Sequence, residues 1–250
     1  YFIDGEYRQI MLSSRELNSN SLPNRSWINE RLQYTHGFGI AMGPVNQVTQ
    51  EGLPVLFIQD LPPTSSVDLS VDQPSIYFGE LSNDYVIVNT NTDEFHYPEG
   101  DDNVSTRYDG TGGVALSSLF RRLLFAVQFR GYEILVSTQL GSDSRIIYHR
   151  NILDRVRSVA PFLEYDADPY LVISDGRLVW MLDAYTISDR YPYATRAANG
   201  VNYIRNAVKI VIDAYDGNLS FYLADAEDPI ARTLQAIFPD LLRPLDELSD

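Results

Sequence analysis

The feature that most constrains this 250-residue sequence is a strongly hydrophobic stretch near its middle. Six apolar side chains recur there at the spacing of one face of an α-helix: Leu116, Leu119, Phe120, Leu123, Leu124 and Val127. Phe125, Ala126 and Phe129 add apolar character outside that face. A helix that is apolar on most sides is normally buried. The sequence therefore predicts a helix over residues 116–129 at the centre of the hydrophobic core.

Strand patterns surround this helix on both sides. Two hairpins are predicted from apolar strands flanking an Asp-Gly turn, one over residues 170–185 and one over residues 208–223. A further strand is expected at residues 133–137, and helices at residues 26–34, at residues 146–160 and after Asp228, where Pro229 suits a first helical turn. Regular alternation of strands and helices is missing.

These patterns predict an α+β fold. Its mixed or antiparallel sheet is built from β-hairpins packed on the buried central helix, with two or three further helices. Residues 1–250 are treated as one domain.

The charge balance and the residue types limit the functions available. There are 34 acidic and 19 basic residues, a net charge of −15, so the surface should repel nucleic acid and anionic lipid unless its bases cluster locally. Cysteine is absent, which excludes disulfides, thiolate metal sites and cysteine nucleophiles. No apolar run reaches the roughly 18 residues that a membrane helix needs. The chain opens inside a strand-like pattern, so we expect it to be part of a longer protein.

An acidic loop before the apolar stretch is a candidate cation site. Glu99, Asp101, Asp102 and Asp109 fall close together, next to Gly100 and Gly110. Calcium takes six to eight oxygen ligands, and carboxylates supply them. The spacing does not match an EF-hand loop. Calcium is therefore the one possible cofactor that the sequence indicates. The alternative is that these residues form a solvated acidic turn.

The segment Asp109-Gly110-Thr111-Gly112-Gly113 invites a second interpretation, because glycine-rich loops before helices bind phosphate through backbone N–H groups. Neither a Gly-Lys-Ser/Thr motif nor a dinucleotide fingerprint follows. The alternative is a tight turn, with Arg121 and Arg122 pairing acidic neighbours.

Histidine and tyrosine give weaker signals. The three histidines, His36, His96 and His149, stand in no metalloprotease motif, and no serine has a nucleophile-elbow pattern. We therefore assign no catalytic residue. Several of the 17 tyrosines cluster at residues 185–203 near carboxylates, where aromatic faces could bind sugars or peptides. The alternative is aromatic packing across hairpins.

A family resemblance adds to this reading. Its motifs, in chain order, are residues 14–18 (SRELN), 34–39 (YTHGFG), 76–80 (IYFGE), 120–126 (FRRLLFA), 155–157 (RVR), 160–163 (APFL), 168–170 (DPY), 188–193 (SDRYPY), 203–206 (YIRN) and 213–217 (DAYDG). Together they cover nearly the whole chain and resemble the uncharacterised protein family 0182 of bacteria. That resemblance implies several transmembrane helices followed by a large extracytoplasmic region. It implies no catalytic residue and no cofactor.

From this resemblance we expect an extracytoplasmic domain that acts in binding or assembly at the cell envelope. Its partners would be its own transmembrane segments, absent from this chain, and an envelope protein or glycan, but not nucleic acid. The alternative is an extracytoplasmic hydrolase acting on an envelope polymer. An enzyme should contain a deep pocket of titratable groups with shifted pKa values. A binding domain should expose an aromatic or apolar patch.

Overall fold

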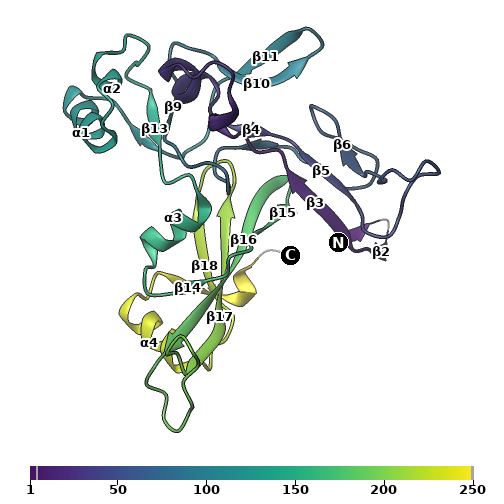
Figure 1. Ribbon diagram of the computed structural model, residues 1–250, viewed down its shortest axis with the longest axis vertical. Coiled ribbons are helices and arrows are strands. Elements are labelled where there is room, and N and C mark those ends of the chain that lie inside the picture. Colours follow the sequence, from purple (N-terminus) through teal and green to yellow (C-terminus); the bar gives the residue numbers. More distant parts are fainter. Residues whose placement is uncertain (4, 249–250) are drawn as a thin grey trace. The chain divides into compact units, whose positions relative to one another are not determined.

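The computed structural model describes residues 1–3 and 5–248 (Figure 1). The chain divides into two compact units, Tyr1–Asn151 with Ala214–Gly217 and Ile152–Asp213 with Asn218–Asp250. Both units combine helices with mostly antiparallel sheets, so the predicted α+β class is confirmed. That residues 1–250 act as one domain stays a prediction.

The first unit is built from small sheets and short helical segments. Its two-stranded sheets pair β1 (Phe2–Ile3) with β2 (Glu6–Tyr7), β4 (Gly37–Phe38) with β8 (Ser75–Ile76), and β10 (Glu94–Glu99) with β11 (Asp102–Thr106). A four-stranded sheet contains, in order, β3 (Ile10–Ser14), β5 (Ile40–Pro44), β6 (Ile58–Gln59) and β7 (Thr64–Ser65). A three-stranded sheet contains β12 (Val114–Ala115), β13 (Arg145–Ile147) and β9 (Val86–Val88). The helical segments are η1 (Ser19–Ser21), η2 (Asn29–Gln33), α1 (Leu119–Phe129) and α2 (Glu133–Val136).

Helix α1 begins and ends where its flanking residues dictate. The Ser118 hydroxyl accepts the Arg121 N–H at 3.3 Å, which satisfies one of the free donors of the first turn. Arg130 adopts a left-handed conformation with φ 53° and closes the last turn. The predicted helix is therefore present, although it starts three residues later than expected.

The prediction that this helix is buried at the centre of the core is wrong. None of the α1 residues is fully buried, and the exposed fractions are 72% for Leu119, 45% for Leu123 and 70% for Val127. The inner side of α1 packs Phe125, Ala126 and Phe129 against a buried cluster, whose members are Leu32, Ile87, Leu116, Ile134, Leu140 and Ile146. The core therefore covers one side of α1. No other described residue covers the opposite side.

The secondary structure predicted for the two segments after α1 is also partly wrong. Both contain short apolar runs, whose periodicity does not distinguish a strand from a helix. Residues 133–137 were expected as a strand, but Glu133–Val136 forms α2, a single turn that buries Ile134. The helix predicted over residues 146–160 is shorter, because Arg145–Ile147 forms the central strand β13 between β12 and β9. Helix α3 (Ile152–Val159) occupies the remainder.

The second unit contains helix α3 and a six-stranded sheet. Its strands are β14 (Glu164–Tyr165), β15 (Tyr170–Ser174), β16 (Arg177–Ser188), β17 (Tyr203–Asp213), β18 (Leu219–Leu223) and β19 (Leu242–Pro244). The long β16–β17 hairpin forms its middle (Figure 1). Along β16 buried and partly buried side chains alternate, as a sheet with one covered face requires. Helix α4 (Pro229–Ile237) and the short η3 (Leu245–Glu247) complete the unit.

The hairpin turn and the helix start predicted in this unit are confirmed. Asp175 and Gly176 both have positive φ, 49° and 73°, as a tight hairpin turn between β15 and β16 requires. The Asp228 carboxylate accepts the Ala231 N–H at 2.7 Å, and Pro229 occupies the first turn of α4.

Candidate functional site

A buried carboxylate, Glu94 at the start of β10, organises a polar network in the first unit. Its Oε2 accepts the Thr35 hydroxyl at 2.5 Å and the Tyr77 hydroxyl at 2.8 Å. Its Oε1 accepts the Tyr108 backbone N–H at 3.0 Å. Burial raises the pKa of Glu94, and these donors oppose that rise because they stabilise the charged form. Glu94 is therefore an acceptor at both oxygens.

Two histidines continue the network from Thr35. The Thr35 Oγ1 lies 2.8 Å from His36 Nδ1, and His36 Nε2 lies 3.1 Å from His96 Nδ1. Because Thr35 donates its one proton to Glu94, it accepts the Nδ1–H of His36. Burial lowers the pKa of His36 to about 3, with smaller contributions from His96 and Arg150. The neutral His36 ring then accepts the Nδ1–H of His96 at its Nε2.

Arg150 fixes the backbone around this network. Its buried guanidinium donates to the carbonyl oxygens of Tyr77 at 2.7 Å, Thr35 at 2.6 Å and Asp84 at 3.4 Å. Burial lowers the pKa of Arg150 to about 10, so the side chain stays charged at neutral pH. Its role is to hold the two segments that carry Thr35 and Tyr77 together.

Two more tyrosines donate to carboxylates next to Tyr77. The Tyr108 hydroxyl donates to Asp216 Oδ1 at 2.8 Å, and the Tyr215 hydroxyl donates to Asp109 Oδ1. The centroids of the three tyrosine rings lie 4.9 to 5.3 Å apart. Burial raises the pKa of all three phenols, so they are neutral. Each has already given its single hydroxyl proton to a carboxylate.

The glycine-rich segment after Asp109 closes onto these tyrosines. The Thr111 N–H donates to Asp216 Oδ1, and the Gly112 N–H donates to the Tyr108 hydroxyl oxygen, both at 2.7 Å. A Cβ at Gly112 would lie 2.6 Å from that oxygen, so glycine permits the close approach. Because protein groups occupy these N–H donors, the structure favours the tight turn over a phosphate loop.

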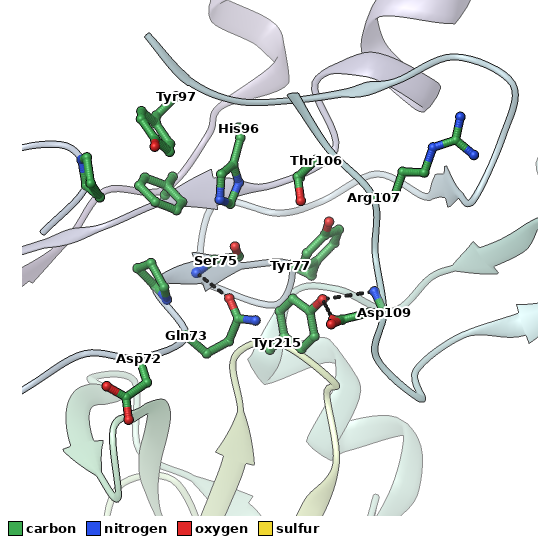
Figure 2. Close-up of a pocket in the computed structure, with 13 residues that line it drawn as sticks. Asp72, Gln73, Ser75, Tyr77, His96, Tyr97, Thr106, Arg107, Asp109 and Tyr215 are labelled. Carbon is green, nitrogen blue, oxygen red and sulfur yellow. Dashed lines mark hydrogen bonds between the residues drawn. The ribbon is translucent and has the colours of Figure 1, made fainter. Parts of the chain in front are cut away.

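A cavity of about 290 Å³ lies beside this network (Figure 2). Tyr77 and Tyr215 line it, together with the half-buried ring of His96 and the exposed carboxylates of Asp72 and Asp109. Figure 2 shows His96, Tyr77 and Tyr215 around its centre, with Asp72 towards its edge.

A second cavity of about 140 Å³ adjoins the first. The two share Phe38, His96 and Tyr97. The Phe38 ring centroid lies 4.2 Å from that of His96 and 4.8 Å from that of Tyr97. A wall of three aromatic rings therefore separates the polar cavity from its smaller neighbour.

Sequence reasoning treated His36 and His96 as isolated residues, and missed Glu94, Tyr77 and Tyr215 as members of a site. Three of the sequence motifs, at residues 34–39, 76–80 and 213–217, converge on the network. That convergence comes from chain topology, which no local pattern reveals. The ring of the third histidine, His149, lies beside that of Tyr148, with centroids 5.1 Å apart and the planes tilted by 52°.

A second candidate site is the outer face of α1 and α2, which lie side by side (Figure 1). Large apolar side chains are exposed along it: Leu119, Phe120, Leu123, Leu124, Val127, Tyr132, Leu135 and Val136. We call these eight residues the α1–α2 apolar face. An exposed apolar surface of this kind marks an interaction site.

The charge around the α1–α2 apolar face is unlike that of the whole chain. Residues 110–142 contain three arginines and one glutamate, although the chain has 34 acids and 19 bases. Arg121 donates to the Ala115 carbonyl oxygen, and Arg122 donates to the carbonyl oxygens of Leu140 and Gly141. Among the described residues, these arginines therefore bind backbone carbonyls and not acidic neighbours.

The residues proposed for calcium do not share one place in the first unit. Glu99 and Asp102 face each other across the β10–β11 hairpin, with Asp101 in its turn. Asp109 lies after β11 and binds Tyr215. In the described part of the chain, no group of three or more His, Cys, Asp or Glu side chains could hold a metal ion. The calcium site stays a prediction.

The tyrosines near residue 185 pack and pair locally in the second unit. The Tyr185 hydroxyl donates to Asp166 Oδ2 at 3.0 Å, and the Tyr203 hydroxyl donates to Asp228. Tyr191 stacks on Tyr203 with centroids 4.8 Å apart. These contacts favour the packing alternative over a sugar or peptide site.

Comparison with known proteins gives one consistent answer. The family model of the Uncharacterised protein family (UPF0182) matches residues 1–250. UPF0182 proteins of Pelotomaculum thermopropionicum, Geotalea uraniireducens and Pelobacter propionicus are 50%, 51% and 53% identical to the whole chain. The chain spans 28% of the length of each of these relatives.

No solved structure matches the chain. Among the described residues, every helix is too short or too polar to cross a membrane.

Proposed function

Because the chain belongs to the UPF0182 family, we propose that it is an extracytoplasmic domain of a bacterial multi-pass membrane protein. Its function would be binding or assembly at the cell envelope. The observation that carries this proposal is the α1–α2 apolar face, whose large side chains lie exposed although they follow a helical stripe.

The energetics of this face favour a docked state. Apolar surface removed from water contributes roughly 25 cal/mol per Å², and monomeric proteins rarely leave a contiguous apolar patch uncovered. Residues on its inner side, such as Phe125 and Phe129, already pack on the core. A partner would therefore meet a rigid, preformed helix surface.

The partner that we propose is the membrane-embedded part of the same protein. Since the chain spans 28% of the length of its relatives, most of a UPF0182 protein lies outside the matched region. Apolar side chains near the end of a transmembrane helix would supply the matching surface, and the arginines around α1 would suit lipid head groups beside it. An envelope protein or glycan stays a further proposed partner.

The alternative, an extracytoplasmic hydrolase, is favoured by one observation. His96 lines a cavity, and its pKa is lowered by burial, as expected for a general base that is neutral at pH 7. A nucleophile must lie within hydrogen-bond reach of such a base. In the described part of the chain, His96 makes no hydrogen bond to the cavity hydroxyls Ser75 and Thr106. Binding or assembly therefore has the stronger support.

Photo-crosslinking in native membranes tests the proposed partner. A benzophenone amino acid at position 127 of the full-length protein should crosslink to an apolar segment of the same polypeptide, identified by mass spectrometry. Position 48 is the matched control, because Val48 is an apolar residue of the same unit and is 67% exposed. Crosslinks from position 127 that match those from position 48 would contradict the proposal, and crosslinks that reach other proteins instead would contradict docking on the membrane-embedded part of the same protein.

The proposed location has its own test. A protease added to intact spheroplasts should cleave exposed loops of this domain in the full-length protein. Protection of the domain until the cells are lysed would reverse the topology.

A further inference from the structure

The polar cavity beside Tyr77 plays no part in the proposed docking function, yet its lining has a strong chemical bias. Two of the tyrosines that line it, Tyr77 and Tyr215, cannot donate a hydrogen bond to a ligand. Tyr77 gives its hydroxyl proton to Glu94, and Tyr215 gives its proton to Asp109. A phenol has a single O–H, so neither hydroxyl has a proton left for a ligand, and the Tyr215 oxygen also accepts the Asp109 N–H at 3.1 Å.

The histidine at the cavity is also an acceptor. The order of donors from Thr35 through His36 makes the Nδ1 of His96 a donor, because His36 Nε2 is the acceptor in that pair. In a neutral imidazole one nitrogen donates and the other accepts. The Nε2 of His96 therefore carries a lone pair.

Negative charge reinforces the bias. Asp72 and Asp109 line the cavity. The Tyr215 hydroxyl donates to Oδ1 of Asp109, and the other lone pairs of this carboxylate remain as acceptor positions. The one cationic side chain of the lining, Arg107, binds Asp93 at 3.1 Å. Figure 2 shows the Arg107 guanidinium turned away from the centre of the cavity. The cavity is thus acceptor-rich and anionic.

A few groups in the lining can donate. Gln73 accepts the Ser75 N–H at its Oε1, which leaves its NH₂ group as a donor. The hydroxyls of Ser75, Tyr97 and Thr106 can donate or accept. These neutral groups suit a hydroxyl on the ligand, while the carboxylates of the lining suit a cationic group at the other end of the ligand.

The aromatic lining selects the same kind of ligand. Ring faces attract cations electrostatically, and the attraction strengthens where water is excluded. Phe38, Tyr77 and Tyr97 line the cavity, and Tyr77 and Phe38 are buried. A volume of about 290 Å³ lies at the lower end of small-molecule sites, so the ligand has few heavy atoms.

We propose that this cavity binds a small organic cation whose ammonium group donates hydrogen bonds to Asp109 and to His96 Nε2. The ammonium supplies three donors and one positive charge, which complement the acceptors and the negative charge of the lining. The aromatic rings flank its carbon atoms.

Calorimetric titration of the 250-residue chain with ethanolamine tests the proposal. Ethylene glycol is the matched control ligand, because it replaces the ammonium by a hydroxyl at nearly the same size. Ethanolamine should bind saturably with one site per chain, and ethylene glycol should bind at least about tenfold more weakly. Absence of saturable ethanolamine binding, or equal binding of the two compounds, would overturn the assignment.

Two substitutions locate the binding. Asp109→Asn keeps an acceptor for Tyr215 while removing the charge, and should weaken ethanolamine binding by about tenfold or more. Asp102→Asn removes the same charge from the exposed β10–β11 hairpin and should change binding by less than about twofold. Thermal unfolding establishes that both variants fold. Equal weakening by the two variants would show a general surface-charge effect and would overturn the proposed site.

If Asp109→Asn fails to fold, the titration is followed by NMR on the unmodified chain. The largest shift changes should then fall at His96 and Tyr215. Changes confined to residues outside the cavity would contradict the proposal.

Discussion

Two regions of the first unit differ in which side chains they bury and which they expose. Around Tyr77, polar groups are buried, and in the described part of the chain every buried side-chain nitrogen or oxygen has a hydrogen-bond partner. On the α1–α2 apolar face, apolar groups are exposed, and no other described residue covers them. The network is satisfied by groups within the described part of the chain, while the face is the surface on which we propose that a partner docks.

The physical reason lies in the cost of each arrangement. A buried polar group without a partner costs free energy of about 1–3 kcal/mol, so Glu94, His36 and Arg150 are held by several bonds each. An exposed apolar side chain such as Leu123 carries no such penalty in a monomer. The chain only forgoes the free energy that burying this side chain would contribute. A chain can therefore leave an apolar face open until a partner arrives.

The largest expected effect comes from two leucines of one segment. Leu116 is 0% exposed and packs in the cluster under α1, whereas Leu123 lies on the α1–α2 apolar face. Leu116→Ala should lower the free energy of unfolding by about 2–5 kcal/mol, and Leu123→Ala by less than about 1 kcal/mol. Urea unfolding of the isolated chain measures both. Equal losses would mean that Leu123 is buried in solution, and would break the comparison.

The second effect is the response of stability to pH, which should arise in the network. His36 has a pKa of about 3 in the folded chain and 6.5 as its ordinary value, so between these pH values the unfolded chain binds a proton that the folded chain does not. Stability should therefore fall as the pH is lowered through this range, by about 1.4 kcal/mol per pH unit. The raised pKa of Glu94 acts in the opposite direction and offsets part of this loss, because the folded state takes up that proton at higher pH.

Urea unfolding between pH 7 and pH 5 measures this slope, with His36→Gln as the variant that removes the titrating ring. The variant should have a flatter slope whatever its absolute stability. Identical slopes would show that His36 titrates normally in the folded state. NMR signals of the His36 ring supply a second readout, since they should not shift between pH 7 and pH 5 in the folded chain.

Local signals in the sequence were sufficient for much of the fold. The Asp175-Gly176 turn places two positive-φ residues in a hairpin, and Asp228-Pro229 places a cap before a first helical turn. Such features depend on residues that are neighbours in the chain. The same is true of α1, whose existence follows from its period.

Burial and the candidate sites could not be predicted in this way. The apolar pattern of α1 predicts an inner and an outer side. Whether the outer side is buried depends on whether other segments of the chain pack against it, which the pattern does not reveal. The network joins Thr35, Glu94 and Tyr215, which lie far apart in the sequence. Short runs such as residues 133–136 contain too few residues to distinguish one helical turn from a strand.

The most direct test of the central claim compares the reactivity of one thiol in two contexts. The chain has no cysteine, so Val127→Cys places a single thiol on the α1–α2 apolar face, and Val48→Cys places a control thiol on an exposed apolar position of the same unit. In the isolated chain both should react rapidly with a maleimide. In a full-length, otherwise cysteine-free protein in its membrane, the thiol at 127 should react at least about tenfold more slowly, while that at 48 is unchanged. Equal reactivity of position 127 in the two contexts would contradict the claim that this face is a docking surface.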